Sequence, residues 1–114
     1  MRIGDLDTVF FWVEDLDAST EWYAAVLEME PVARHGGWQI MSTGAVTFAL
    51  HEGKGPHSQV NAVVAFAVTD LDSAIEQLAA IGIDPTDPVT DTGRARFVTI
   101  SDPDGNHIQL LERS

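Results

Sequence analysis

Hydrophobic and polar residues alternate along several short stretches of this chain, a period-two pattern that is typical of β-strands. The clearest stretch is Val9 to Val13, which is aromatic and β-branched. A helix is predicted to follow from Ala18 to about Leu27, with Asp17 as its N-cap. Three more strands are predicted after it, separated by Gly36-Gly37 and Thr43-Gly44, near Pro31 to Arg34, Trp38 to Ser42 and Ala45 to His51.

The same pattern restarts 55 residues later. Nine of the eighteen residues at positions 9–26 are identical to those at 64–81, including the runs Asp15-Leu16-Asp17 and Asp70-Leu71-Asp72. Two copies are too few for a solenoid. We therefore predict one α+β domain built from two tandem βαβββ modules, at about residues 7–52 and 61–112, with a linker at about 53–60.

The second half shows its own start and stop signals. A helix is predicted from about Leu71 to Ile81, ending at Gly82. Strands are predicted near Asp84 to Thr90 and Arg94 to Ser101, and the prolines in the first indicate an edge or irregular strand. The run Asp102-Pro103-Asp104-Gly105 strongly favours a β-turn, and it predicts a hairpin at the end of the chain.

The repeat also sorts the first strand of each half into two faces. The residues that match between halves are large and apolar, so we expect them to pack on the helices: Val9, Phe11, Val13, Val64, Phe66 and Val68. The intervening residues differ, as the lining of a ligand cavity is free to do: Thr8, Phe10, Trp12, Val63, Ala65 and Ala67.

Composition narrows the classes of function. Six Lys and Arg against 18 Asp and Glu give a net charge of −12, which argues against nucleic acid as a partner. The absence of cysteine excludes disulfides, thiolate metal sites and a catalytic thiol. The N-terminal residues do not form a signal peptide and no apolar run approaches a membrane span, so we expect a cytoplasmic protein with no membrane partner. Arg94 and Arg96 are expected to bridge surface carboxylates rather than bind a ligand.

The closing hairpin resembles a known family. Residues 102–110, Asp-Pro-Asp-Gly-Asn-His-Ile-Gln-Leu, are similar to the pattern Asp-Pro-Asp-Gly-Asn-x-Ile-Glu-Leu of the vicinal oxygen chelate superfamily, which includes the glyoxalase, bleomycin-resistance and extradiol-dioxygenase proteins. The resemblance spans about Asp7 to Glu112. It implies a curved, cup-shaped mixed sheet with the helices outside, a small-molecule ligand in the cup and a homodimer.

The resemblance also locates the positions that hold metal in metal-dependent members, and these are Thr8, Ala49, Val63 and Gln109 here. Alanine and valine cannot coordinate an ion, while threonine and glutamine are weak neutral ligands. We therefore expect no catalytic metal and no cofactor. A displaced site built from His51, His107 and Gln109 stays open, although polar residues on a cavity wall explain these histidines more simply. His35 and His57 fall in predicted loops.

The predicted cup is aromatic with a few polar groups, as small-molecule pockets are. Phe10, Trp12 and Trp38 are predicted to stack on a ligand, and His51, His107 and Gln109 to orient it. The favoured function is metal-independent binding of a planar small molecule. The negative net charge of the protein suits a cationic ligand. Two alternatives stay open: a family enzyme of lyase, isomerase or dioxygenase type that uses a displaced metal or a histidine acid–base, and an accessory protein with a collapsed cup.

Overall fold

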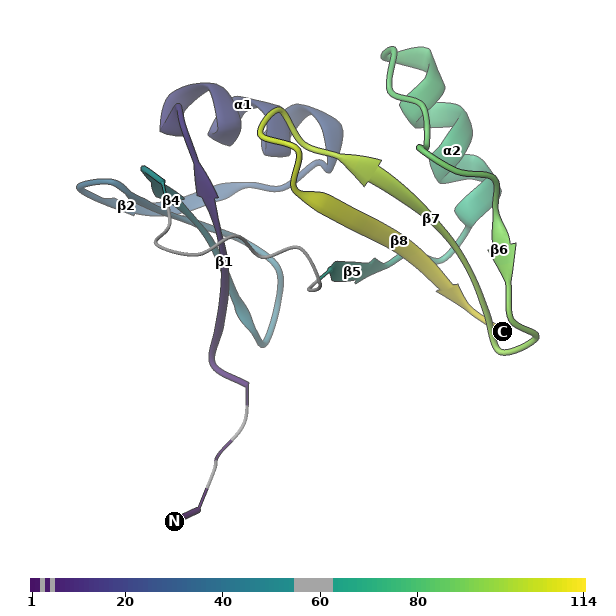
Figure 1. Cartoon of the computed structure of the whole chain (residues 1–114), viewed down its shortest axis with the longest axis horizontal. Helices are drawn as coiled ribbons and strands as arrows, with labels where there is room; N and C mark the ends of the chain where they lie inside the picture. Colours follow the sequence, from purple (N-terminus) through teal and green to yellow (C-terminus); the bar gives the residue numbers. More distant parts are fainter. Residues whose placement is uncertain (3, 5, 55–62) are drawn as a thin grey trace. The chain divides into compact units, whose positions relative to one another are not determined.

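The computed structural model describes residues 1, 2, 4, 6–54 and 63–114 (Figure 1). The chain divides into two compact units, Met1–Ser58 and Gln59–Ser114, and each contains one helix and one four-stranded sheet. Most of the predicted linker at about 53–60 lies outside the described residues. Within the described residues, no helix is long and apolar enough to span a membrane.

The first unit has the predicted order of elements. It consists of β1 (Thr8–Val13), α1 (Leu16–Val26), β2 (Pro31–His35), β3 (Trp38–Met41) and β4 (Thr47–Glu52). The strands lie in the order β1-β4-β3-β2, with β1 parallel to β4 and the other neighbours antiparallel. The first and last strands of the module therefore lie side by side, and α1 lies along one face of the sheet (Figure 1).

Helix α1 begins at Leu16, and the prediction of Asp17 as its N-cap was wrong. The N-cap is Asp15, which has extended backbone angles and whose carboxylate accepts a hydrogen bond from the Ala18 amide at 3.1 Å. The helix therefore begins two residues earlier than predicted, and its first residue, Leu16, is 2% exposed and belongs to the core. Asp17 lies in that turn, where a negative charge stabilises the helix dipole.

The core of the first unit lies between α1 and its sheet. Tyr23 is fully buried, and its ring centroid lies 5.5 Å from that of Phe48, which in turn lies 5.6 Å from Phe11. Val13 is also buried. The prediction that Phe11 and Val13 point toward the helix is confirmed, which leaves the alternate residues of β1 on the opposite face of the sheet.

The second unit repeats this arrangement. It consists of β5 (Val64–Ala67), α2 (Leu71–Ala80), β6 (Thr90–Asp91), β7 (Ala95–Ser101) and β8 (His107–Arg113), and its strands lie in the order β5-β8-β7-β6. Again the first strand is parallel to the last. Asp70 caps α2 through the Ser73 amide at 3.0 Å, and the helix buries Leu71 and Leu78. The prediction of an α+β fold with two tandem βαβββ modules is confirmed.

The predicted strand from Asp84 to Thr90 is almost absent, since β6 covers only Thr90–Asp91. Pro85 and Pro88 have no N–H to donate to a ladder, so this edge cannot pair continuously. The Thr86 amide, between the two prolines, still donates to the Thr99 carbonyl at 2.8 Å.

The hairpin turn between β7 and β8 forms as predicted. Gly105 has a φ of 81°, in the left-handed region that glycine adopts without cost. The buried carboxylate of Asp102 accepts hydrogen bonds from the Asp104 amide at 2.9 Å and from the backbone and side-chain amides of Asn106 at 2.8 Å. Asp102 thus provides hydrogen-bond acceptors for two backbone amides of the turn that joins β7 to β8.

Candidate functional site

Four of the six predicted ligand-binding side chains lie together on the side of the first sheet that faces away from α1. We call this set the aromatic face, and it consists of Phe10, Trp12, Trp38 and His51. The register of the strands places them, because Trp12 on β1 and Trp38 on β3 are both direct partners of His51 on β4. Phe10 precedes Trp12 by two residues and therefore shares its side of the sheet.

Phe10 and His51 each contact all the other rings of the aromatic face. The ring centroid of Phe10 lies 5.7 Å from that of Trp12 and 5.1 Å from that of Trp38, at interplanar angles of 73° and 60°. The imidazole of His51 lies 4.2 Å from Trp12, 5.5 Å from Trp38 and 5.9 Å from Phe10. Edge-to-face contacts at such distances are the favoured geometry of aromatic pairs. The rings thus form one continuous surface, joined through Phe10 and His51.

This surface is accessible within its own unit. Phe10 is 41% exposed, whereas Tyr23 on the opposite side of the sheet is 0% exposed. Trp12, Trp38 and His51 are half-buried. Burying Phe10 under another molecule would remove apolar area from water, which is favourable by roughly 25 cal/mol per Å².

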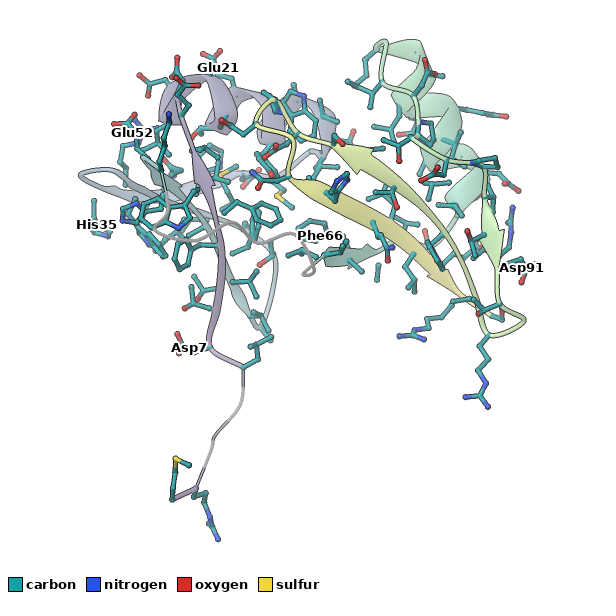
Figure 2. The ribbon with its side chains drawn as sticks, in the orientation of Figure 1. Asp7, Glu21, His35, Glu52, Phe66 and Asp91 are labelled. Carbon is teal, nitrogen blue, oxygen red and sulfur yellow. The ribbon has the colours of Figure 1, made fainter. Side chains whose placement is uncertain are left out.

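His51 is held by the backbone of the next residue. Its Nδ1 lies 3.1 Å from the carbonyl oxygen of Glu52. A carbonyl only accepts hydrogen bonds, so Nδ1 must carry the proton of this contact. Glu52 is itself fixed, because its amide donates to the Gly37 carbonyl at 2.7 Å and its carboxylate accepts from the Leu16 amide at 3.2 Å (Figure 2).

Gly53 and His35 border the aromatic face, and the sequence did not identify them as part of it. Gly53 has a φ of 129°, and a Cβ added there would lie 3.5 Å from the Trp12 ring. His35 was predicted in a loop, but it ends β2 and is the direct partner of Trp38 (Figure 2). The signal was present, because a two-residue loop such as Gly36-Gly37 pairs the residues on either side of it.

The other two predicted residues, His107 and Gln109, belong to β8 of the second unit. Gln109 is half-buried and pairs with Ala65 on one side and Thr99 on the other. His107 is exposed and pairs with Ser101. Both therefore lie on the side of their sheet opposite the buried Ile108 and Leu110.

The residues at the four family metal positions do not fit an ion. Ala49 is 0% exposed, lies between Phe10 and Ile40 in the register, and has no donor atom. Val63 also lacks a donor, and the Thr8 hydroxyl donates to the carboxylate of Asp7. Across the part of the chain that the structure describes, no three His, Asp or Glu side chains are close enough to share a metal ion.

The two arginines that contact the helices neutralise carboxylates there. Arg34 pairs with Asp17 at the start of α1, and Arg96 pairs with Asp72 at 2.9 Å at the start of α2. The hydrogen bond and positive charge of Arg96 lower the pKa of Asp72 and, in return, raise the pKa of Arg96. For Arg96, the prediction of a surface bridge is confirmed.

Comparisons with solved structures support the fold. An integron cassette protein from the mobile metagenome of V. cholerae is 25% identical, with 100% of this chain and 98% of that chain covered and a TM-score of 0.78. A glyoxalase/bleomycin resistance protein/dioxygenase from Nocardioides is 22% identical over 99% of this chain and 85% of that chain, with a TM-score of 0.80. The fosfomycin resistance protein FosX from Listeria monocytogenes is 18% identical over 99% and 96%, also with a TM-score of 0.80.

No curated protein sequence matches the chain significantly. The model of one protein family does match, however, and it covers residues 5–110, nearly the whole chain. Its match agrees with the two βαβββ modules and with the motif of the closing hairpin. The chain therefore belongs to the Glyoxalase/Bleomycin resistance protein/Dioxygenase superfamily.

Proposed function

We propose that this protein binds a planar small molecule on the aromatic face of its first unit, and that it does so without a catalytic metal. The observation that carries the proposal is the contact of Phe10, Trp12, Trp38 and His51 on the side of the first sheet that faces away from α1. Three large aromatic rings and one polar ring match the composition of small-molecule sites, which combine an apolar surface with a few polar groups.

The mutual contact of the rings defines how a ligand binds. Because the ring centroids of Phe10 and His51 lie 4.2 to 5.9 Å from those of the other rings, a ligand cannot insert between these pairs. It lies over their outward surface instead, where Phe10 is the residue with the highest exposed fraction of the four. A flat ligand gains most from such contact, since stacked or edge-to-face rings contribute about 0.5–1.5 kcal/mol beyond the area they bury.

Charge favours a cationic ligand. The net charge of −12 gives the protein a negative potential that concentrates cations and repels anions. Indole rings also attract a cation placed over their faces, by about 0.5–2 kcal/mol. The basic side chains of Arg34 and Arg96 are directed to the helix side of their sheets, where they pair with carboxylates.

The residues themselves argue against a catalytic metal in this role. The family positions within the first unit are Thr8 and Ala49, and only the threonine has a donor atom. A tight divalent site needs three or four good ligands. Ligand binding in the proposal therefore depends on aromatic contact and hydrogen bonding alone.

Intrinsic tryptophan fluorescence tests the proposal, because Trp12 and Trp38 belong to the aromatic face. Titration with 10-methylacridinium and with neutral acridine is expected to quench the emission, and the cation is expected to bind more tightly. Phe10→Ala should weaken binding by about twofold to tenfold, which corresponds to the loss of one aromatic contact. Fluorescence that does not change across a panel of planar cations and neutral compounds would contradict the proposal.

Trp22 provides the matched control. It lies on α1, where its ring contacts Tyr23 at 5.0 Å on the opposite side of the sheet from the aromatic face. Trp22→Phe should therefore leave both the quenching and the affinity intact, whereas Trp38→Phe should reduce the quenching. A loss of binding in Trp22→Phe alone would place the ligand elsewhere.

A further inference from the structure

We propose that His51 presents a fixed hydrogen-bond acceptor to the ligand and thereby selects planar molecules that carry an N–H or O–H group on their edge. This inference rests on the proposed function and deepens it, because it specifies the chemical class of the ligand. It depends on which nitrogen of the His51 ring carries the proton and on where the other nitrogen is exposed.

The contact with Glu52 determines the tautomer. Nδ1 of His51 lies 3.1 Å from the Glu52 carbonyl oxygen, which cannot donate, so the proton resides on Nδ1. In the neutral ring, Nε2 then carries a lone pair and accepts a hydrogen bond.

The position of the Glu52 carbonyl is secured from two sides. The amide of Glu52 donates to Gly37 at 2.7 Å, and its carboxylate accepts from Leu16 at 3.2 Å. The following residue, Gly53, also donates its amide to the Val13 carbonyl at 2.9 Å. The carbonyl therefore holds the His51 ring in one tautomer and one orientation.

The second nitrogen is available to a ligand. Among the described residues, Nε2 of His51 has no hydrogen-bond partner, and no buried side-chain nitrogen or oxygen there lacks one. Nε2 therefore reaches solvent. The two ring nitrogens point in nearly opposite directions, so Nε2 lies at the edge of the imidazole farthest from Glu52.

The neighbours of this nitrogen are apolar. The His51 ring contacts Trp12, Trp38 and Phe10, whose aromatic surfaces offer no other strong acceptor. A ligand stacked on these rings leaves one edge near His51. If that edge carries an N–H, the ligand gains a hydrogen bond with Nε2. If it carries a methyl group, the ligand makes no such bond and excludes solvent from Nε2.

Two ligands that differ at one atom test this. β-Carboline has a ring N–H, and 9-methyl-β-carboline replaces that hydrogen with a methyl group; both are uncharged in mildly alkaline buffer. Isothermal titration calorimetry on the full chain is expected to show that β-carboline binds about threefold to tenfold more tightly, the effect of one neutral hydrogen bond. The variant His51→Phe keeps an aromatic ring without the acceptor. It should bind β-carboline and 9-methyl-β-carboline with about equal affinity.

The outcomes separate this inference from the proposed function. If the wild-type protein binds both compounds equally, or if His51→Phe retains the preference, the inference is wrong while the aromatic face still binds planar molecules. If neither compound binds while 10-methylacridinium does, the inference alone is wrong, and if none of the three compounds binds, the proposed function is wrong as well. Trp22→Phe, on α1 and on the opposite side of the sheet from the aromatic face, serves as the control and should keep the wild-type preference.

A measurement on the wild-type protein covers the case in which His51→Phe does not fold. Long-range ¹H–¹⁵N NMR distinguishes the two histidine tautomers directly. We expect a protonated Nδ1 and an unprotonated Nε2 for His51, and we expect β-carboline to shift the Nε2 resonance more than its methylated analogue does. A proton on Nε2 in the free protein would overturn the proposal.

Discussion

The carboxylate of Glu52, at the end of β4, accepts a hydrogen bond at 3.2 Å from the backbone amide of Leu16, the first residue of α1. The second unit repeats this relationship, since Glu112 on β8 accepts from the Leu71 amide, also at 3.2 Å. Both contacts arise because the last strand of each module runs parallel to the first and ends beside the N-terminus of the helix (Figure 1). Each helix is thus stabilised by a residue from the far end of its own module.

Removing this contact should weaken the first unit. Glu52→Ala leaves the Leu16 amide without its acceptor and removes a negative charge from the positive end of the helix dipole, so the free energy of unfolding should fall by about 1 kcal/mol. Glu52→Gln keeps an acceptor oxygen and should lose less. Urea denaturation measures both.

Variants at two other glutamates provide a smaller and a larger loss of stability for comparison with Glu52→Ala. Glu21 is exposed on α1, and Glu21→Gln should change stability by less than about 0.5 kcal/mol. Glu112→Ala should cost more than Glu52→Ala, because Glu112 also lies 3.4 Å from a guanidinium nitrogen of Arg96. If Glu52→Ala is as stable as wild type, the hydrogen bond between Glu52 and the Leu16 amide does not stabilise the protein.

The pair Asp72–Arg96 predicts a dependence of stability on acid pH. Arg96 donates a hydrogen bond to Asp72, and its positive charge lies next to the carboxylate. Both effects lower the pKa of Asp72 from its ordinary value of 3.8. A carboxylate with a lowered folded-state pKa contributes stability that is present above 3.8 and is lost as the pH falls through the folded-state pKa. The difference in free energy of unfolding between wild type and Arg96→Gln should therefore decrease as the pH falls below 3.8.

NMR titration of the Asp72 carboxyl carbon checks the cause. In Arg96→Gln the pKa of Asp72 should rise toward 3.8, since both the hydrogen bond and the positive charge are gone. Arg94→Gln is the control, because Arg94 is exposed and forms no ion pair with the described residues. An unchanged pKa of Asp72 in Arg96→Gln would contradict the assignment.

Glu28 adopts a backbone conformation that suits glycine. Its φ is 57°, and among the described residues it is the only non-glycine residue with a positive φ. It follows the C-cap of α1, a position that commonly takes the left-handed conformation. Since that conformation costs a residue with a Cβ about 1 kcal/mol, Glu28→Gly should raise the free energy of unfolding by about 0.5–1 kcal/mol in urea.

Glu30 makes the comparison specific. It is also exposed and lies two residues further along, but its φ is not positive. Glu30→Gly should therefore leave stability unchanged or lower it, because glycine only adds freedom to the unfolded chain there. If both variants lose stability, the conformation of Glu28 carries no strain.

Metal removal should have no effect on the protein. Ala49 and Val63 supply no donor atoms at two of the four family metal positions, so a divalent ion has too few ligands to bind tightly. Protein purified without a histidine tag should contain far less than one equivalent of metal by elemental analysis. Treatment with EDTA, followed by addition of Zn²⁺, Mn²⁺ or Mg²⁺, should leave the melting temperature and acridinium binding unchanged; a melting temperature that rises with one stoichiometric ion would contradict this.

Local sequence was sufficient for the order of the modules and for the two faces of β1, although not for the N-cap of α1 or for the extent of β6. The alternation along β1 and its repeat 55 residues later separated Phe11, which packs toward α1, from Phe10 and Trp12, which point the other way. Side chains of a strand alternate between two faces, so this follows from the order of residues alone. The turn at Asp102 and Gly105 was equally local, since it depends on backbone angles and hydrogen bonds within five residues.

Tertiary structure decided the contacts between segments that lie far apart in the chain. Leu16 is buried in the core as the first residue of α1, with Asp15 rather than Asp17 as the N-cap. The carboxylate of Glu52 reaches the Leu16 amide only after β4 has paired with β1. The sequence determined which side chains share a face, whereas strand pairing across some 36 residues determined which atoms meet, because hydrogen bonds require positions that no local pattern specifies.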